Sequence, residues 1–177
     1  MEFTICSFPP REWRDELLEG FERRQEVFHC WRRVEGELRL LPVQYVEDWD
    51  EDDLALLSRN IQKTIERGGV LFGAPIEGRL AGFALLDGQP FGSSAQYLDL
   101  AEFYVSAPFR RQGLGRVLFA AACGEARRRG ARFLYISAHS AEGSMAAYAR
   151  LGCTAAEEVN AALAEREPFD IPLQFAL

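Results

Sequence analysis

One stretch of the chain, VSAPFRRQGLGRVL at residues 105–118, constrains the fold more than any other. A run of strand-forming residues ends before Pro108, two arginines follow, and regular structure resumes through Gly113 and Gly115. The first turn of a helix leaves its backbone N–H groups without partners and carries a partial positive charge. Two glycines there leave room for a phosphate to accept hydrogen bonds from those groups. An ordinary strand-to-helix turn, in which the glycines serve geometry only, explains the stretch equally well.

Three kinds of phosphate-binding loop can be compared with this stretch. A Walker A loop requires G-x-x-x-x-G-K-[ST], a pattern that the sequence lacks. A dinucleotide loop requires G-x-G-x-x-G after the first strand, but Leu118 takes the place of the third glycine, two-thirds of the way along the chain. The pattern that fits is R-x-x-G-x-G, formed by Arg110, Gly113 and Gly115 between a predicted strand and a predicted helix.

Composition bounds the class of protein. The chain has 177 residues, 48% of them apolar, which suits one domain with a sizeable core. A net charge of −7 argues against nucleic acid as the main partner and is compatible with a cationic substrate. The four cysteines are too widely spaced for a metal site. The absence of a signal peptide and of a long apolar run predicts a cytoplasmic protein with no membrane partner.

Hydrophobic periodicity and turn signals predict the remaining elements. The predicted helices cover residues 10–28, 48–67, 114–129 and 142–151. The predicted strands cover residues 29–46 in two pieces around Glu35-Gly36, then 70–76, 79–87, 95–107, 131–138 and 171–177. The first helix is expected to bury Trp13, Leu17, Leu18 and Phe21, and the third Leu114, Val117, Leu118, Ala121 and Ala122. The acidic run at 47–53 is interpreted as helix capping, with a substrate-binding wall as the less favoured alternative.

The order of these motifs resembles the Gcn5-related N-acetyltransferase (GNAT) family. The likeness covers LAEFYV, RRQGLG, the helix RVLFAAACGEARRRG, the strand RFLYISA and the helix ending AAYARLG, within residues 97–152. The hairpin VLFGAPIEGRLAGFALLD and the tail EEVNAALAEREPFDIPLQFAL are similar to a bacterial branch of the family. The resemblance implies one domain over 1–177, with its cofactor-binding part at 70–158. The expected fold is a mixed, mostly antiparallel sheet of six or seven strands with a splayed parallel pair, flanked by helices.

The resemblance also implies acetyl-CoA as the cosubstrate. Its pyrophosphate would bind the amides from Arg111 to Arg116, and its pantetheine arm would lie beside the strand ending at Val105. An unpaired strand edge suits that peptide-like arm. The residues that the resemblance assigns to cofactor binding are Phe103, Tyr104, Val105, Arg110, Arg111, Gln112, Gly113, Leu114, Gly115, Arg116, Ser140 and Tyr148.

Acetyl transfer to a primary amine requires a base for the amine, a donor for the oxyanion and a proton for the departing thiolate. By resemblance, Tyr148 is the acid and the N–H of Val105 or of its neighbour is the oxyanion donor. Tyr148 could instead only pack its helix. Asp99 and Glu102 are the candidate bases, on opposite sides of the strand if side chains alternate, and each could also be an ordinary polar residue. His139 is a weaker candidate.

Two departures keep alternatives open. The family often has an Asn seven residues before the tyrosine, where this chain has Ala141, so Ser140 or Ser144 would have to substitute. The carboxylate of Asp99 is one methylene shorter than the Glu common at its position. The chain is therefore expected to acetylate a small amine or a peptide amine by direct attack in a ternary complex, as a possible homodimer. A CoA-binding sensor without chemistry and an acyltransferase that uses another acyl-CoA are the alternatives.

Overall fold

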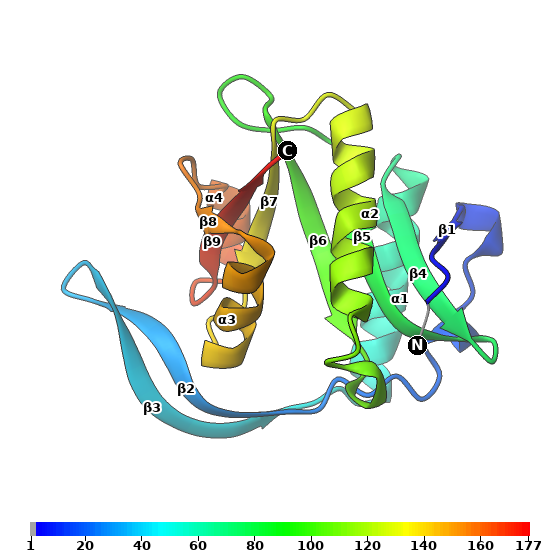
Figure 1. Cartoon of the computed structure of the whole chain (residues 1–177), viewed down its shortest axis with the longest axis horizontal. Helices are drawn as coiled ribbons and strands as arrows, with labels where there is room; N and C mark the ends of the chain where they lie inside the picture. Colours follow the sequence, from blue (N-terminus) through cyan, green and yellow to red (C-terminus); the bar gives the residue numbers. More distant parts are fainter. Residues whose placement is uncertain (1–2) are drawn as a thin grey trace.

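A seven-stranded sheet carries the glycine-containing loop and both strands that flank the predicted cofactor site (Figure 1). The computed structural model describes residues 3–177. The strand order is β1 (Cys6–Phe8), β4 (Val70–Ile76), β5 (Arg79–Leu86), β6 (Tyr97–Val105), β7 (Phe133–Ala138), β9 (Ile171–Ala176) and β8 (Thr154–Ala155). Only β6 and β7 run parallel; every other neighbouring pair is antiparallel. The predicted fold class is confirmed.

Helices cover both faces of the sheet. The helix α2 (Leu114–Arg128) packs on one face together with α3 (Glu142–Leu151), and α1 (Glu51–Glu66) packs on the other (Figure 1). A short α4 (Ala161–Arg166) precedes β9. No helix between residues 3 and 177 is both long and apolar enough to cross a bilayer.

The predicted buried stripe of α2 is wrong in one position and incomplete. Val117 is 44% exposed, and Ala121 is only half-buried. The helix buries Leu114, Leu118, Phe119, Ala122, Cys123 and Ala126 instead. These residues follow the three- and four-residue spacing of a single helix face, whereas Val117 lies outside it.

The first predicted helix is wrong. Residues 10–28 form two 3₁₀ turns, Pro10–Glu12 and Asp15–Leu18, followed by extended chain that enters β2 (Gln25–Val34). Gly20 has a left-handed φ of 68°, and the chain from Gln25 onward pairs with a neighbouring strand instead of coiling. The apolar spacing still marked core residues, because Trp13, Leu18 and Phe21 are buried. From Gln25 onward, strand pairing therefore overrode the helical pattern.

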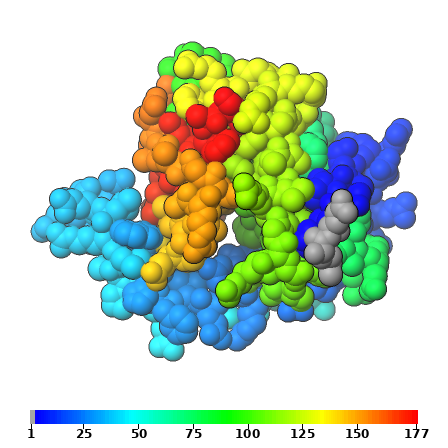
Figure 2. All heavy atoms as spheres, in the orientation of Figure 1, coloured from blue at the N-terminus to red at the C-terminus, as the bar shows by residue number. Residues whose placement is uncertain are grey.

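The strands β2 and β3 (Glu37–Glu47) form a separate two-stranded sheet, the β2–β3 arm of residues 25–47. Its tight turn lies at Glu35 and Gly36, as predicted, and both residues have positive φ angles, 50° and 86°. Two positive φ angles are the signature of a type I′ hairpin turn. The arm is held at its middle, where the N–H of Trp31 donates to the carbonyl of Ser140. Its turn end projects away from the body of the molecule (Figures 1 and 2).

The acidic run between the arm and α1 does cap the helix. The Asp50 carboxylate accepts from the Asp53 N–H at 2.9 Å, and the Asp53 carboxylate accepts from the Asp50 N–H at 3.1 Å. This reciprocal pair is a capping box, which satisfies amides that the first helical turn leaves free.

The parallel pair β6–β7 is short. Its register is Tyr97 with Phe133, Leu98 with Leu134 and Asp99 with Tyr135. Beyond Asp99, β6 stays paired with β5 and β7 with β9. The two strands therefore diverge after three residue pairs, and the sheet opens at that point.

Candidate active site

The loop between β6 and α2 presents a row of unused backbone donors. Among the residues 3–177, nothing accepts a hydrogen bond from the N–H groups of residues 111–115. Gly113 occupies the N-cap position of α2 with φ of 88°, and no side chain caps this helix. Arg111 also has a positive φ, 61°. Consecutive amides of this kind at a helix N-terminus form an anion-binding site.

Glycine serves a different purpose at each of the two positions in the loop, Gly113 and Gly115. The left-handed φ of Gly113 favours glycine, because a side chain would strain that backbone conformation, although a Cβ there would meet nothing within 4 Å. A Cβ on Gly115 would meet only ordinary contacts, Phe103 at 3.6 Å and Val105 at 3.7 Å. Neither backbone strain nor crowding within the chain therefore demands glycine at position 115. The missing side chain leaves space for a group from outside the chain.

The three arginines of the loop are placed differently. Arg110 donates to backbone carbonyls from all of its guanidinium nitrogens: to Val105 at 2.9 Å and to Arg23 and Arg24 at 2.6 Å each, with Glu22 at 3.4 Å. It ties the loop to the segment that leads into the arm. Arg111 and Arg116 are exposed beside the free amides. Gln112 donates to the carbonyl of Pro108 at 2.9 Å and closes the loop.

The diverging edge of β6 carries the next predicted group. The Ser106 N–H donates to Ala81 on β5 at 2.9 Å. Because backbone groups alternate between the two edges of a strand, the N–H groups of Phe103 and Val105 are directed to the opposite edge, where β7 has separated. The molecular surface is hollowed between α3 and the start of α2 (Figure 2). The predicted unpaired edge is therefore present at residues 100–105.

Asp99 and Glu102 lie on the same face of β6, so the prediction of opposite faces is wrong. The register pairs Glu102 with Leu85 and Leu100 with Leu86, which leaves Ala101 as an extra residue in a β-bulge. The bulge shifts the alternation: Leu98, Leu100, Phe103 and Val105 pack on the α2 face, whereas Ala101 and Tyr104 pack on the α1 face. Asp99 and Glu102 share the α1 face, and each is close enough to Arg166 for that guanidinium to lower its pKa.

Both carboxylates are poised to titrate near neutral pH. Burial, with a smaller contribution from the charge of Asp87 and against a lowering by Arg166, raises the pKa of Asp99 to about 7. Burial likewise raises the pKa of Glu102 to about 7, against a lowering by the Tyr104 hydroxyl and Arg166. The Oδ1 atom of Asp99 is buried without a hydrogen-bond partner in residues 3–177. A carboxylate with a pKa near 7 suits a general base.

Tyr148 lies on α3 with its ring 6.1 Å from that of Phe103. Burial raises the pKa of its hydroxyl, and the charges of Cys153, Asp170, Glu102 and Asp99 raise it further. The hydroxyl therefore stays protonated at neutral pH. The charges of Glu102 and Asp99 thus act on the Tyr148 hydroxyl, although Tyr148 packs on the α2 face and the two carboxylates lie on the α1 face of β6.

The side chains of Ser140 and His139 contact residues of the β2–β3 arm. The Ser140 hydroxyl accepts from the Arg32 guanidinium, and Ala141 packs among Val27, Cys30 and Val43 of the arm. The Nε2 atom of His139 lies 3.3 Å from the Tyr45 hydroxyl and 3.4 Å from a Glu47 carboxylate oxygen. The position where the family often has Asn is thus a core position against the arm.

An aromatic group beside the candidate bases was not predicted. The rings of Trp49 and Tyr104 lie 4.6 Å apart, edge to face, and Phe21 stacks on Trp49 at 5.9 Å. The Arg23 guanidinium lies over the Tyr104 ring at 5.2 Å and over the Trp49 ring at 5.9 Å. The only signal in the sequence was one tryptophan within the acidic run, which capping alone does not explain.

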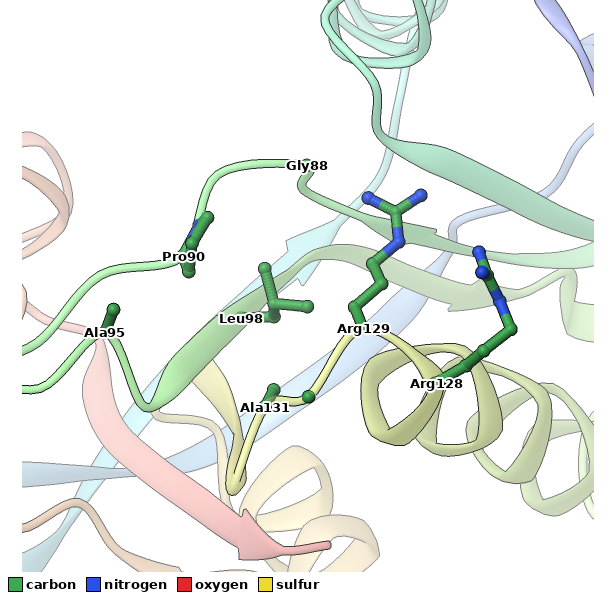
Figure 3. A pocket seen from close by; sticks show the side chains of 8 residues that line it. Gly88, Pro90, Ala95, Leu98, Arg128, Arg129 and Ala131 are labelled. Carbon is green, nitrogen blue, oxygen red and sulfur yellow. The ribbon is translucent and has the colours of Figure 1, made fainter.

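A cavity of about 410 Å³ lies at the other end of α2 (Figure 3). Its wall includes Arg128 and Arg129, and its floor Leu98. Both arginines are already bonded to Glu125, whose pKa they lower to about 2, and Arg129 also donates to the Gly68 carbonyl. The cavity is remote from the glycine-containing loop and does not belong to the site.

Comparison with known proteins agrees with the geometry. The chain is similar to nourseothricin acetyltransferase, with 21% identity, a TM-score of 0.69 and coverage of 98% of this chain and 96% of that one. It is also similar to a protein of Bacillus anthracis described as a streptothricin acetyltransferase, solved with acetyl coenzyme A, with 13% identity, a TM-score of 0.70 and coverage of 100% and 99%. PaiA N-acetyltransferase of Thermoplasma acidophilum, solved with coenzyme A, has 12% identity, a TM-score of 0.58 and complete coverage of both chains. At these identities the likeness establishes the fold.

A match at the level of sequence establishes the family. The search of curated proteins found no match to the sequence. The sequence model of the acetyltransferase (GNAT) family, however, matches residues 34–153, which include the β6 edge, the glycine-containing loop and Tyr148. The chain therefore belongs to the GNAT family of acetyltransferases.

Proposed function

We propose that this acetyl-CoA-dependent acetyltransferase delivers the acetyl group to a cationic primary amine by direct attack while both substrates are bound. One observation carries the proposal. The gap that opens after Asp99 has free N–H groups along the β6 edge, and the charges of Glu102 and Asp99 lie near enough to raise the pKa of the Tyr148 hydroxyl.

The free amides of residues 111–115, with Arg111 and Arg116 beside them, fit a pyrophosphate. The Phe103 and Val105 amides fit the peptide-like arm of the cosubstrate. Arg110 and Ser140 were predicted to bind the cosubstrate, but in this proposal they do not. Their side chains are hydrogen-bonded within the protein, so Arg110 holds the glycine-containing loop and Ser140 holds the β2–β3 arm in place. Tyr104 contributes its ring to the acceptor side, because it packs on the α1 face.

Each chemical requirement has a group in the gap. Glu102, with Asp99 as the second candidate, accepts the proton that the ammonium must lose before its nitrogen can bond to the acetyl carbon. The Val105 N–H donates to the carbonyl oxygen as negative charge develops there. As the carbon–sulfur bond breaks, the Tyr148 hydroxyl gives its proton to the sulfur and regains one from solvent. The nitrogen, now bonded to the acetyl carbon, loses its second proton to solvent and becomes the neutral amide. No covalent intermediate with the protein is needed.

The charge of the acceptor follows from what surrounds the gap. Asp99, Glu102 and Asp170 all affect the Tyr148 hydroxyl, and Arg166 is the cation that acts on all three carboxylates. Trp49 and Tyr104 already hold the Arg23 guanidinium at cation–π distance. Carboxylates and aromatic faces together favour a positively charged amine over a neutral or acidic one.

The test is thiol release from acetyl-CoA, followed with a colorimetric thiol reagent over a panel of amines. The panel contains neutral, acidic and polycationic amines. It also contains nourseothricin, because one structural neighbour is named nourseothricin acetyltransferase. We expect turnover with cationic amines, intersecting double-reciprocal lines, and loss of at least about tenfold in kcat in Tyr148→Phe. Thermal stabilisation by CoA should be equal in the wild type and Tyr148→Phe.

Three results would contradict the proposal. Turnover confined to neutral or acidic amines would refute the cationic acceptor. Stabilisation by CoA without turnover on any amine would favour the sensor alternative, and faster turnover with a longer acyl-CoA would favour the other acyltransferase alternative.

The extent and location of the protein complete the proposal. We propose that residues 1–177 form one acetyltransferase domain, since the same sheet takes β1 from one end of the described chain and β9 from the other. A cytoplasmic location remains the prediction from sequence.

A further inference from the structure

Beside the candidate bases lies a buried cation for which the chain supplies no counter-charge. Arg23 is 7% exposed, and no carboxylate of residues 3–177 forms an ion pair with it. Its neighbour Arg24 is exposed and lies 3.5 Å from a Glu26 oxygen and 3.8 Å from an Asp48 oxygen. A guanidinium stays charged at any physiological pH, and a charge removed from water without a partner costs free energy. The buried arginine therefore lacks the partner that the exposed one has.

One edge of the Arg23 guanidinium has donors that the protein does not use. Nη1 donates to the side-chain oxygen of Gln25 at 2.9 Å, whereas Nε and Nη2 form no hydrogen bond in the part of the chain that the structure describes. Neither atom is closed off from solvent, because Oδ1 of Asp99 is the only side-chain polar atom of residues 3–177 that is fully buried without a partner. The N–H groups on Nε and Nη2 of an arginine are parallel, and this pair of donors matches the two oxygens of a carboxylate.

The guanidinium is held in place before any ligand arrives. Its central carbon lies 5.2 Å from the centre of the Tyr104 ring and 5.9 Å from that of the Trp49 ring. The backbone of Arg23 is fixed as well, since its carbonyl accepts from Nη2 of Arg110 at 2.6 Å. A side chain that is already immobilised loses little conformational freedom when a ligand binds. This placement suits a residue that selects a substrate.

Tyr104 connects Arg23 with the candidate bases. The Tyr104 side chain packs on the α1 face of β6, where Asp99 and Glu102 also lie. Burial raises the pKa of the Tyr104 hydroxyl, with the charge of Glu102 acting in the same direction and the charge of Arg23 in the opposite direction. The carboxylate and the guanidinium are thus both close to one hydroxyl. An acceptor whose ammonium reaches Glu102 has a cation of the protein within its span.

We propose that Arg23 determines specificity by binding a carboxylate of the acceptor, so that the substrate is a cationic amine that also carries a carboxylate, as a diamino acid does. The inference rests on the proposed function, because it adds a second contact to the acceptor of the same reaction. An amine without the carboxylate would leave the buried guanidinium unpaired in the complex, which is the larger part of the discrimination.

The test compares acceptors that differ only at the carboxylate. Lysine and lysinamide have the same carbon chain and the same two amino groups, and ornithine and its amide form a second pair with a shorter chain. Thiol release from acetyl-CoA gives kcat/KM for each acceptor. With the wild type, kcat/KM should be at least about tenfold higher for the acid than for the amide in at least one pair.

Variants at Arg23 separate recognition from folding. Arg23→Gln removes the charge and the parallel donors, and it should lower kcat/KM for the acid at least about tenfold more than for the amide. Arg23→Lys restores the charge alone and should recover only part of this difference. A purely structural role would lower both values alike and keep their ratio. Arg59→Gln changes an exposed arginine on α1 and should keep the wild-type ratio. Thermal stabilisation by CoA verifies that each variant is folded.

The outcomes distinguish this inference from the function on which it rests. Equal kcat/KM for acid and amide in both pairs, preference for a simple diamine over lysine and ornithine, or an acid-to-amide ratio that Arg23→Gln leaves unchanged would overturn the role of Arg23 and leave the cationic acceptor intact. Turnover with no amine at all would overturn the proposed function and this inference together.

Discussion

At the scale of single residues, Gly115 separates what the fold needs from what the ligand needs. It lies inside the first turn of α2 with room for a Cβ. Glycine within a helix is less stable than alanine by about 0.5–1 kcal/mol. Gly115→Ala should therefore raise the free energy of unfolding by about that amount and weaken CoA binding by at least about tenfold. Urea denaturation and calorimetric titration measure the two effects, and an unchanged affinity would show that the phosphate does not approach this residue.

Glu102 should set the acidic limb of the activity profile. Burial raises the pKa of this carboxyl to about 7, so it is protonated below that pH and cannot accept a proton. We expect kcat/KM to rise tenfold per pH unit below about 7 and to level off above it. Glu102→Gln should lower the plateau by about 10²-fold or more and remove this limb. If the limb persists in Glu102→Gln and disappears in Asp99→Asn, Asp99 is the base.

Asp99 should also link stability to pH. Its folded-state pKa of about 7 lies above the usual 3.8, so its contribution to stability is complete below pH 3.8 and is lost as the pH rises to 7. Between pH 5 and pH 8 the free energy of unfolding should fall by roughly 2–3 kcal/mol more in the wild type than in Asp99→Asn. Denaturation at both pH values measures this difference, and parallel curves for the two proteins would contradict it.

At the scale of elements, the capping box of α1 makes a local prediction. Asp50→Ala removes the acceptor for the Asp53 N–H and should lower the free energy of unfolding by about 1 kcal/mol. Asp52→Ala removes a carboxylate from the same turn that caps no amide, and its effect should be less than half as large. Thermal denaturation of both variants makes the comparison. Equal losses would mean that charge, not hydrogen bonding, is what these acids supply.

Local signals predicted the elements that form through local interactions. The turns at Glu35-Gly36 and Glu77-Gly78, the acidic start of α1 and the glycine-containing start of α2 depend on residues a few positions apart, and all are present. The predicted helix over residues 10–28 is absent: residues 10–18 form two 3₁₀ turns, and from Gln25 onward the chain pairs with β3, more than ten residues away. Spacing alone cannot reveal a partner that distant.

The bulge at Ala101 shows the same limit within the site. Strand alternation placed Asp99 and Glu102 on opposite faces, and the register with β5 brings them to one face. Nothing in LDLAEFYV marks where an extra residue interrupts the alternation. The Tyr104–Trp49 pair was missed for a similar reason, since the two rings meet only after the arm and α1 have packed.

At the scale of the whole molecule, the sheet consists of two halves that are joined by a short seam. The strands β1, β4, β5 and β6 form one half and β7, β9 and β8 the other, and three residue pairs connect them. A pantetheine chain that forms hydrogen bonds with the β6 edge should make that edge open to solvent less often. With CoA at about 100 times its dissociation constant, the complex gains about 2.7 kcal/mol over the free protein.

Hydrogen exchange should locate that gain. Amides of residues 103–105 and 111–115 should exchange more slowly with CoA bound, and amides at the tip of the β2–β3 arm should not change. The arm is the internal control, because it lies outside the cofactor site. Equal protection throughout the chain would indicate general stabilisation in place of binding in the gap.

The length of the paired segment between β6 and β7 also sets a distance within the site. Each residue of strand advances about 3.3 Å, so the position at which pairing stops fixes how deep between the strands a linear molecule can reach. One additional pair after Asp99 would shorten the opening by one residue of strand, about 3.3 Å. The point at which the two strands part therefore limits how far a linear group can enter between them, independently of the residues that perform the chemistry.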